Sequence, residues 1–299
     1  MKNLFILILI SLIMISTAFA AGDTGLAFLK IGVGARATAM GEAYVGLSDD
    51  PSGIYWNPSG SAWTDKRQAH FSYNSWIQGM NHNVAAMTLP TKVGTFGIGL
   101  LLNNIDGFER RTFASEEPQG TFSSHDFSVI LNYSQRIGDK LSIGGNFKYI
   151  NEKIYIDDAS GYMIDLGARY KAPVSGLWLA AAVQNFGFSS AMAEEELRLP
   201  RTIRLGAAYR APFAEMNNKL LFAVDWVQLL EEDGHINLGA EYNPVPMLAL
   251  RLGYQTGYET KDISAGFGVN TNWVNIDYAY VPFGRDLGDS HRFSLTTCF

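Results

Sequence analysis

The sequence predicts an all-β fold: a closed, membrane-spanning barrel of about 14 antiparallel strands with a partly helical N-terminal plug in its lumen. Three observations predict this fold. Segments in which apolar and polar residues alternate recur along the chain, the chain ends on such a segment, and its first residues have the pattern of a secretory signal. Successive side chains of a strand point to opposite faces, so these segments suit lipid on one side and water on the other.

The first twenty residues are predicted to be a signal peptide. Lys2 supplies the basic start, residues 4–15 are mostly apolar, and residues 18–20 form an A-x-A cleavage site. An uncleaved membrane anchor is disfavoured because an apolar helix of this length rises only about 18 Å, against a hydrocarbon core of roughly 30 Å. The residue directly after the cleavage site is Ala21 and not Cys, which disfavours a lipoprotein. We therefore expect residues 1–20 to be removed during export.

The composition agrees with a membrane protein that crosses the bilayer with strands. Apolar residues make up 47% of the chain, yet after Ile15 no run approaches the roughly 18 apolar residues that a spanning helix needs. Aromatic residues make up 13%, which suits the aromatic belts of membrane barrels. A net charge of −6 without a basic run argues against binding of nucleic acid. The single Cys298 excludes an internal disulfide, and its alternation places it toward the interior.

Residues 21–65 do not follow the alternating pattern. They are rich in glycine and combine a short amphipathic piece at 35–45 with a turn at 48–51. Tyr55 and Trp56 carry apolar area to bury, which disfavours a disordered periplasmic leader. A barrel of about 14 strands has a lumen wide enough to need filling. We therefore predict that residues 21–65 fold into the lumen as a plug from the periplasmic side.

The barrel is predicted to comprise residues 66–299. Residues 141–150 show the pattern, with Leu141, Ile143, Phe147 and Tyr149 on one face and Ser142, Gly144, Asn146 and Lys148 on the other. Similar alternation occurs in 162–171, 203–210, 248–255 and 274–280. Charged residues fall on the polar faces of such strands, where water and partner charges solvate them. We expect these charged residues to line the lumen: Arg169, Arg204, Arg210, Asp225 and Arg251.

The predicted connections support a barrel with both termini in the periplasm. The connections on that side are mostly short, at 90–92, 138–139, 172–175, 243–246 and 271–272, with the longest at 212–218. The predicted external loops include the two longest of the chain, 104–124 and 187–200. Outer-membrane barrels have short periplasmic turns and longer external loops. In a soluble β-sandwich, the alternative fold, we would not expect short connections at one end and long loops at the other.

The last strand is predicted at residues 291–299, where Phe293, Leu295, Thr297 and Phe299 share one face. A final strand that ends on Phe resembles the signal that the outer-membrane assembly machinery of bacteria reads on its clients. We therefore expect the chain to reside in the bacterial outer membrane, with that machinery and outer-membrane lipid as partners. Phe299 is the candidate assembly signal.

The plug carries a resemblance to a known family. Residues 34–45, followed by Asp49-Asp50-Pro51 and by the sequence YWNPSG at 55–60, resemble the N-terminal region of the PorV/PorQ family, which is similar to FadL-type long-chain fatty-acid transporters. FadL-like proteins have Asn-Pro-Ala where this chain has Asn57-Pro58-Ser59. The resemblance implies a 14-stranded barrel with an N-terminal hatch. The plug motif comprises Gly34, Arg36, Gly41, Asp49, Asp50, Tyr55, Trp56, Asn57, Pro58 and Gly60.

No constellation of catalytic residues is visible. The chain lacks a G-x-S-x-G elbow, and none of its five histidines pairs with another at metal-ligand spacing. Ser124, His125 and Asp126 are adjacent in a predicted strand, so neighbours point to opposite faces. Asp49-Asp50 beside Pro51 is more typical of a turn than of a calcium site. We expect a protein that is not an enzyme, with no metal and no cofactor.

Two groups of residues are candidates for a transport site. Gly94, Gly97 and Gly99 lie in the third predicted strand, where glycine permits a kink. The resemblance to FadL-like barrels implies a lateral exit there, and close packing against the plug is the alternative. External apolar residues form either a cup for a hydrophobic ligand or the packing between long loops: Phe108, Phe113, Phe122, Phe186, Phe188 and Met192.

The sequence leaves two functions open. The first is passive uptake of hydrophobic small molecules, which enter at the loops and leave once the plug shifts. The second is a component of type IX protein secretion or surface attachment, whose external loops bind secreted protein clients. Members of the resembled family serve either role, and the modest length of the loops favours the first.

Overall fold

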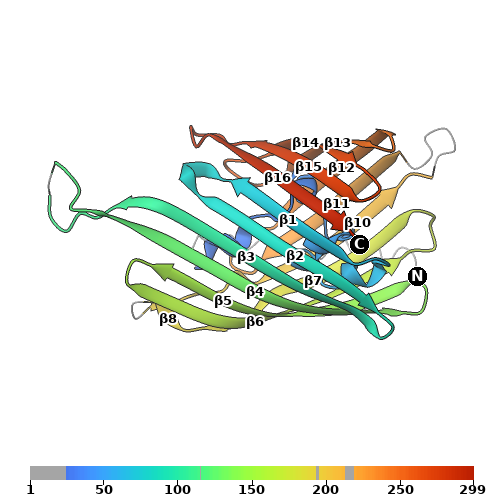
Figure 1. The fold of residues 1–299 in the computed structure, drawn as a ribbon, viewed down its shortest axis with the longest axis horizontal. Helices are drawn as coiled ribbons and strands as arrows, with labels where there is room; N and C mark the ends of the chain where they lie inside the picture. Colours follow the sequence, from blue (N-terminus) through green and yellow to red (C-terminus); the bar gives the residue numbers. More distant parts are fainter. Residues whose placement is uncertain (1–24, 115, 193–194, 213–218) are drawn as a thin grey trace.

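The computed structural model describes residues 25–114, 116–192, 195–212 and 219–299, so the predicted signal peptide lies outside the described residues. The chain forms a closed barrel of fourteen antiparallel strands (Figure 1), and β8 and β9 form a separate two-stranded sheet. The predicted all-β barrel is therefore confirmed. Within the described residues, no helix is both long enough and apolar enough to cross a membrane.

The barrel strands follow one another around the wall in chain order. They are β1 (Gln68–Ser75), β2 (Asn81–Thr91), β3 (Gly94–Glu109), β4 (Thr121–Ile137), β5 (Leu141–Ile154), β6 (Asp157–Lys171), β7 (Leu177–Ser189), β10 (Thr202–Arg210), β11 (Leu220–Leu229), β12 (His235–Val245), β13 (Leu248–Gln255), β14 (Ile263–Asn270), β15 (Val274–Pro282) and β16 (Asp289–Cys298). The small sheet pairs β8 (Ala191–Met192) with β9 (Glu195–Glu196).

The barrel closes through its first and last strands. Phe71 of β1 lies opposite Leu295 of β16 on one side and opposite Ala85 of β2 on the other. Closure satisfies the backbone hydrogen bonds of every strand without leaving a free edge, which is the requirement for a sheet in lipid. The final predicted strand therefore closes the wall.

Alternation places polar and smaller apolar side chains inside the barrel and large apolar side chains outside. In β11 the inward residues are buried: Leu221, Ala223, Asp225 and Val227. The outward residues are large, apolar and exposed: Phe222 (46%), Val224 (42%) and Trp226 (37%). The charged residues Arg169 and Arg251, which were predicted to line the lumen, are likewise buried, each 4% exposed. Such a continuous apolar exterior would be unfavourable in water. It is stable in contact with the hydrocarbon core of a membrane.

The two ends of the barrel differ. At one end, where the C-terminus lies, the connections are mostly short, and we call this the periplasmic end because outer-membrane barrels place their short turns there. At the other, external end, β3 and β4 form a long hairpin that extends past its neighbours (Figure 1). The prediction that residues 104–124 form one loop was wrong. Pairing between β3 and β4 continues to Glu109↔Thr121, with a register shift between Ile105 and Phe108 that breaks the alternation.

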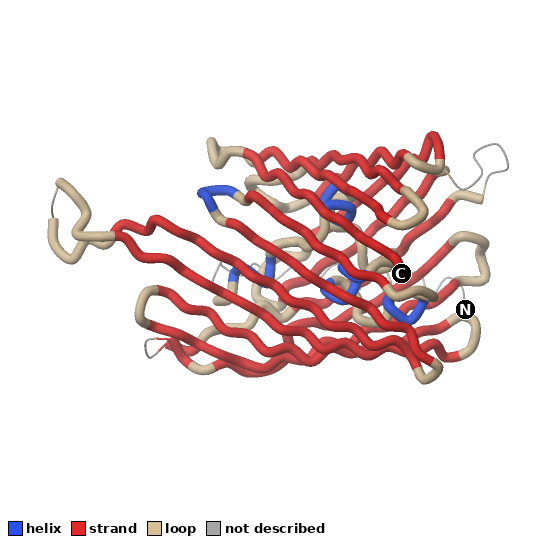
Figure 2. Tube along the Cα trace, in the orientation of Figure 1, coloured by secondary structure: helices blue, strands red, loops and turns tan. Residues whose placement is uncertain are grey.

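The segment before β1 lies inside the barrel as short helical pieces (Figure 2). These are η1 (Ala27–Lys30), α2 (Ala35–Ala39), η2 (Pro51–Tyr55) and η3 (Gly60–Trp63), while η4 (Ile77–Gly79) lies in the β1–β2 connection. Lys30 forms an ion pair with Glu232 at the external end of β11, with Nζ and Oε1 3.0 Å apart. The segment therefore extends from the external end, at η1, to the periplasmic end, where it enters β1.

The hydrophobic core lies between this segment and the inner wall. One cluster packs Met40, Tyr44 and Trp56 against Leu221 and Ala223. A second cluster packs Leu26, Phe28 and Val33 against strand residues that include Leu101, Ile150 and Met163. Fully burying one large apolar side chain contributes roughly 1.5–3 kcal/mol, so the two clusters hold residues 26–56 firmly in the lumen. We call residues 25–65 the plug.

Deleting Phe299 is expected to lower the amount of folded barrel in the outer membrane without reducing export across the inner membrane. The Phe299 side chain is 62% exposed and therefore contributes little packing, so its loss tests recognition by the assembly machinery. Heat-modifiable electrophoretic mobility of outer-membrane fractions measures the folded amount. Val93→Ala, which trims another exposed apolar side chain at the periplasmic end, is the control. An unchanged folded amount after deletion would rule out this role.

Candidate functional site

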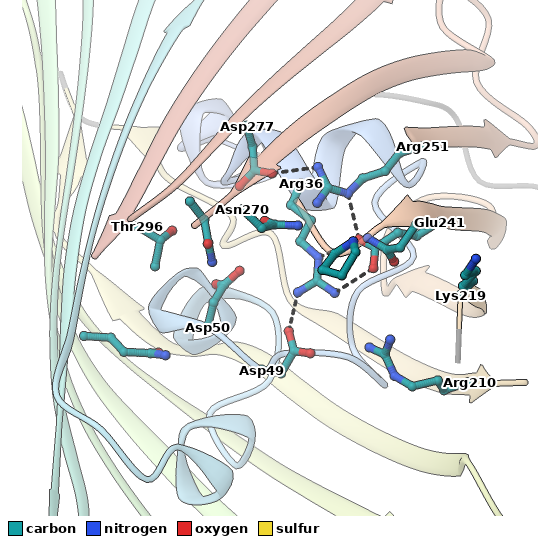
Figure 3. Close-up of a pocket in the computed structure, with 14 residues that line it drawn as sticks. Arg36, Asp49, Asp50, Arg210, Lys219, Glu241, Arg251, Asn270, Asp277 and Thr296 are labelled. Atoms are coloured by element: carbon teal, nitrogen blue, oxygen red, sulfur yellow. Dashed lines mark hydrogen bonds and ion pairs between the residues drawn. The ribbon is translucent and has the colours of Figure 1, made fainter. Parts of the chain in front are cut away.

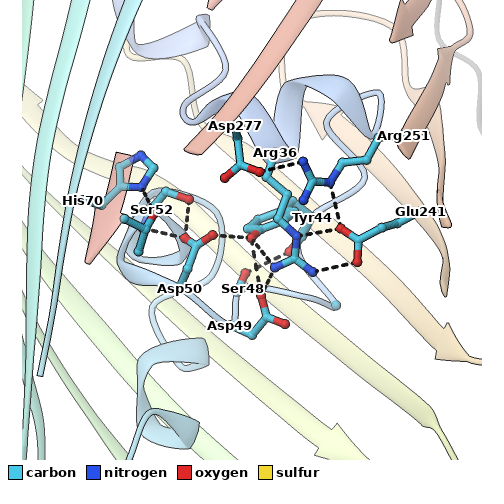
Figure 4. A network of polar contacts seen from close by, with 12 residues as sticks. Arg36, Tyr44, Ser48, Asp49, Asp50, Ser52, His70, Glu241, Arg251 and Asp277 are labelled. Atoms are coloured by element: carbon cyan, nitrogen blue, oxygen red, sulfur yellow. Dashed lines mark hydrogen bonds and ion pairs between the residues drawn. The ribbon is translucent and has the colours of Figure 1, made fainter. Parts of the chain in front are cut away.

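A chain of charges joins the plug to the barrel wall near the periplasmic end (Figure 4). Arg36 of α2 pairs with Glu241 of β12 (2.9 Å between Nε and Oε2) and with Asp49 of the plug (2.6 Å between Nη1 and Oδ1). Glu241 also pairs with Arg251 of β13, which in turn pairs with Asp277 of β15, each at 2.7 Å. We call Arg36, Asp49 and Glu241 the latch, because they connect the plug to the wall.

Local structure positions the latch. Gly34, at φ 82°, precedes α2 in a conformation that favours glycine, and α2 then directs Arg36 toward β12. Asp50 caps η2 by accepting a hydrogen bond from the backbone N–H of Ser52 (2.8 Å), with Pro51 following it. The hydroxyl of Tyr44 donates to Asp50 (2.6 Å). The acidic pair therefore serves a cap and an ion pair, as expected for a turn.

The latch is expected to weaken in acid. Burial on its own raises the pKa of Asp49, but the neighbouring Arg36 guanidinium outweighs burial and holds this pKa below its ordinary value. Because the pKa of Asp49 is lower in the folded protein, its charge stabilises the plug fully at any pH above the unfolded-state pKa of about 3.9. This stabilisation is lost as the pH falls through the pKa that Asp49 has in the folded protein. Single-channel conductance should therefore be low at pH 6 and rise below about pH 4. In Asp49→Asn that pH-dependent step should vanish, and a step that persists would contradict this assignment.

Asn57-Pro58 forms a corner that contacts the wall. The Asn57 amide donates to the carbonyl oxygens of Val45 (3.3 Å) and Ala168 (3.2 Å), and its oxygen accepts from the Ser59 backbone N–H (3.1 Å). A Cβ on Gly167 of β6 would collide with the Asn57 oxygen, so glycine in the wall permits this approach. The neighbouring Trp56 indole donates to the carbonyl of Val33 (3.0 Å).

Gly41 and Gly60 of the motif also lie in close contacts. Gly41 adopts φ 63°, and a Cβ there would lie 2.7 Å from the backbone nitrogen of Tyr254. A Cβ on Gly60 would collide with the backbone of Ser48. These contacts place the plug backbone directly against itself and the wall.

A mainly apolar cavity of about 440 Å³ lies at the external end. We call it the external cup. Its lining combines plug, β1–β2 connection and strand residues: Ala27, Phe28, Ile31, Trp76, Met80, Asn103, Ile105, Phe108, Phe122, Ser124, Asp126, Glu152 and Ile154. The Phe108 and Phe122 rings stack with their centroids 5.2 Å apart. An apolar concave site of this size suits a small hydrophobic molecule.

The external cup includes only part of the predicted set of apolar contacts. Phe108 and Phe122 line it, whereas Phe113, Phe186, Phe188 and Met192 do not. Phe113 (66%) and Phe188 (69%) are exposed instead. Sequence reasoning missed Phe28 and Ile31 of the plug and Trp76 and Met80 of the β1–β2 connection. Their apolar character was visible, but their position at the external end follows from the path of the plug.

A second cavity lies in the lumen and is much smaller, about 90 Å³. We call it the central chamber. Plug residues Tyr55 and Trp56 line it together with wall residues such as Lys148, Gln184 and Arg204. The Arg204 guanidinium lies over the Trp56 ring, 5.1 Å from its centroid. The small volume shows that side chains of the plug and the wall fill most of the space around Tyr55 and Trp56.

The three glycines of the third strand lie in a continuous wall. β3 pairs with β2 from Asn81↔Asn104 to Thr91↔Gly94 and with β4 from Thr95↔Ser134 to Ile105↔Ser124. Gly97 lies against Asn132 of β4. At Gly99 an added Cβ would lie 2.8 Å from the Tyr55 hydroxyl. The wall is thus closed at these glycines, and Gly99 gives the plug room to approach it.

Tyr55 contacts this wall from the lumen side, at two residues that also line a groove on the exterior. Its hydroxyl donates to the Leu100 carbonyl of β3 (2.8 Å) and lies 3.3 Å from the Ala85 carbonyl oxygen of β2. Ala85 and Leu100 are register partners. Both also line a groove of about 540 Å³ on the lipid-facing exterior, bounded by apolar residues such as Phe71 and Phe293. At Ala85–Leu100, therefore, the wall lies between this lipid-facing groove and Tyr55, which also lines the central chamber.

Comparisons with known proteins identify the fold. No protein-family model matches the chain, and neither does any curated protein sequence. Among solved structures, the "CymD monoaromatic hydrocarbon channel" superimposes with a TM-score of 0.65 at 11% identity, covering 90% of this chain and 98% of that one. The "TodX deltaS2S3 mutant monoaromatic hydrocarbon channel" gives a TM-score of 0.63 at 15% identity, covering 89% and 98%. The chain therefore has the fold of these channels over almost their whole length.

Proposed function

We propose that this protein is a passive channel for small hydrophobic molecules in the bacterial outer membrane. The observation that carries the proposal is the external cup, because its apolar lining includes plug residues Ala27, Phe28 and Ile31. A molecule bound there touches the plug directly, so binding and opening are coupled. The shared fold with channels described as monoaromatic hydrocarbon channels supports this class of cargo.

In this proposal the plug must move for cargo to pass. The external cup is about 440 Å³, whereas the central chamber, which shares Ile31 with it, is about 90 Å³. A molecule that fits the first does not fit the second without displacement of plug residues such as Tyr55. A ligand shifts a conformational equilibrium only by its differential affinity for the two states, and the apolar contacts of the external cup would supply that difference.

We further propose that cargo leaves sideways through the wall at Ala85–Leu100. Gly94, Gly97 and Gly99 lower the cost of bending β3, and Tyr55 offers a donor to carbonyls that bending would leave unpaired. The lipid-facing groove on the other side would receive an apolar molecule without exposing it to the charged lumen. Lateral release therefore remains a prediction that this geometry supports.

Phe122→Ser is expected to lower hydrocarbon uptake about tenfold, because the substitution removes an aromatic wall of the external cup and adds a hydroxyl. The measurement is the entry rate of radiolabelled toluene into cells with an intact lipopolysaccharide layer that express equal amounts of folded protein. Phe113→Ser, the same change at a phenylalanine outside the external cup, should leave the rate unchanged. Equal loss in both variants, or in neither, would count against the external cup.

A second candidate function is binding of secreted protein clients, as the PorV/PorQ resemblance of the plug suggests. The feature that favours it is the β3–β4 hairpin, which projects past its neighbours (Figure 1). Phe113, in the connection between these two strands, is 66% exposed. If correctly assembled wild-type protein moves no hydrocarbon, and deletion of residues 110–120 abolishes surface attachment of secreted proteins, this second function replaces the first.

A further inference from the structure

The periplasmic end of the lumen contains a polar cavity of about 500 Å³ that the proposed route of hydrophobic cargo does not use (Figure 3). We call it the vestibule. Its lining includes four cationic and four acidic side chains: Arg36, Arg210, Lys219 and Arg251, and Asp49, Asp50, Glu241 and Asp277. Its volume falls in the range of roughly 300–1,000 Å³ that is typical of small-molecule sites.

One side of the vestibule is already paired. Arg251 holds both Glu241 and Asp277, and Arg36 holds both Glu241 and Asp49. Asp50 accepts hydrogen bonds from Tyr44 and from Ser52. These charges satisfy one another and offer little to a ligand.

The opposite side, where β10 ends and β11 begins, has cations without such partners. Among the described residues, neither Arg210 nor Lys219 makes a side-chain hydrogen bond or ion pair, although both are half-buried. Both point inward by alternation, because Arg210 follows the buried Ala208 and Lys219 precedes the buried Leu221 by two residues each. Figure 3 shows the two side chains on the side of the vestibule away from Asp277.

A nearby arginine adds to the positive charge on the Arg210–Lys219 side of the vestibule. Arg169 of β6 donates to the Gly46 carbonyl (2.9 Å) and stacks on Trp178, with 4.1 Å between its guanidinium carbon and the ring centroid. Arg169 thus adds positive charge beside Arg210, and Asp49, whose charge acts on both, is already paired with Arg36. Asn243, whose backbone N–H donates to the Lys219 carbonyl (2.8 Å), brings an amide to the same rim.

We propose that the vestibule binds a small dianion bearing carboxylate or phosphate groups from the periplasmic side, held between Arg210 and Lys219. A guanidinium presents two parallel N–H donors that match a carboxylate or phosphate, and an ammonium adds a compact charge. Such a ligand completes the charge pairing that the other side of the vestibule already has. It requires neither movement of the plug nor the hydrophobic route, so this site stands apart from the proposed transport.

Isothermal titration calorimetry on the purified full-length chain in detergent micelles tests the site, with inorganic phosphate in one arm and succinate in the other. Low ionic strength is required because salt screens such contacts. We expect saturable binding of at least one anion with one site per chain. The double variant Arg210→Gln, Lys219→Gln should weaken that binding at least tenfold. Binding of only one of the two anions identifies whether the site favours phosphate or carboxylate.

The matched control is the double variant Lys140→Gln, Lys171→Gln, which removes two exposed cations at the same end of the barrel outside the vestibule. It should bind the anion as wild type does. Heat-modifiable mobility verifies that each variant is folded. Absence of saturable binding by wild type in both arms, or equal weakening in the control, would overturn the proposal and would leave the proposed transport function untouched.

Discussion

Replacing Arg36 by glutamine is expected to release the plug and to give the barrel a persistent open state. Arg36 is the only side chain of the latch that touches both Asp49 and Glu241, and its side chain is 17% exposed. Removing one partner of a partly buried ion-pair network costs about 3 kcal/mol, because Asp49 then loses its ion-pair partner and Glu241 keeps only Arg251. That free energy raises the population of unlatched plug by roughly 100-fold.

Two measurements follow the release. Conductance of single channels in planar bilayers should rise in Arg36→Gln, and protease added to folded protein should cleave within residues 25–65. Arg285→Gln is the matched control, because Arg285 forms an exposed ion pair with Glu259 whose side chains are 65% and 75% exposed. Exposed pairs contribute about 0–1 kcal/mol, so the control should behave as wild type. If the conductance of Arg36→Gln stays at the wild-type level and its plug resists protease, the latch is refuted.

Placing a tryptophan at Ala85 is expected to reduce hydrocarbon uptake to the rate of cells that lack the protein. Ala85 is a small outward residue in the lipid-facing groove, opposite Leu100 and next to the Tyr55 hydroxyl. An indole there fills the groove, while its outward direction leaves the plug and the lumen unchanged. Uptake is measured with radiolabelled toluene, and folded protein is quantified in the same membranes.

Two further variants separate lateral exit from effects on the barrel as a whole. Val224→Trp places the same bulk on the exterior of β11, away from the groove, and should leave uptake unchanged. Gly99→Val should also lower uptake, because it obstructs the proposed exit from the lumen side. The Cβ of the new side chain would lie 2.8 Å from the Tyr55 hydroxyl. Normal uptake in well-assembled Ala85→Trp and Gly99→Val would exclude this exit.

The fold follows from local information to a large extent. A period of two is a property of neighbouring residues, so the strands, the lumen charges Arg169 and Arg251, and the closing strand were predictable. The external extent of β3 and β4 was not. A register shift between Ile105 and Phe108 breaks the alternation, and the pairing that continues beyond it depends on the partner strand.

The site was predictable only in part. Arg36, Asp49 and Asp50 stand out as plug residues, but the partner Glu241 lies 205 residues from Arg36, and no local pattern connects the two. The glycines of β3 indicated an unusual wall, whereas the contact between Gly99 and Tyr55 depends on how the plug packs. Residues of the external cup come from the plug, the β1–β2 connection and three strands, so their convergence is a product of the tertiary fold.

The most direct test of a channel for small hydrophobic molecules is a crystal structure of the full-length protein soaked with 4-bromotoluene, recorded at the bromine absorption edge. The proposed function predicts an anomalous peak inside the external cup, between Phe28 and the Phe108–Phe122 pair, that disappears in Phe122→Ser. Bromine peaks confined to the lipid-facing exterior, with none in the external cup of the wild-type protein, would contradict it.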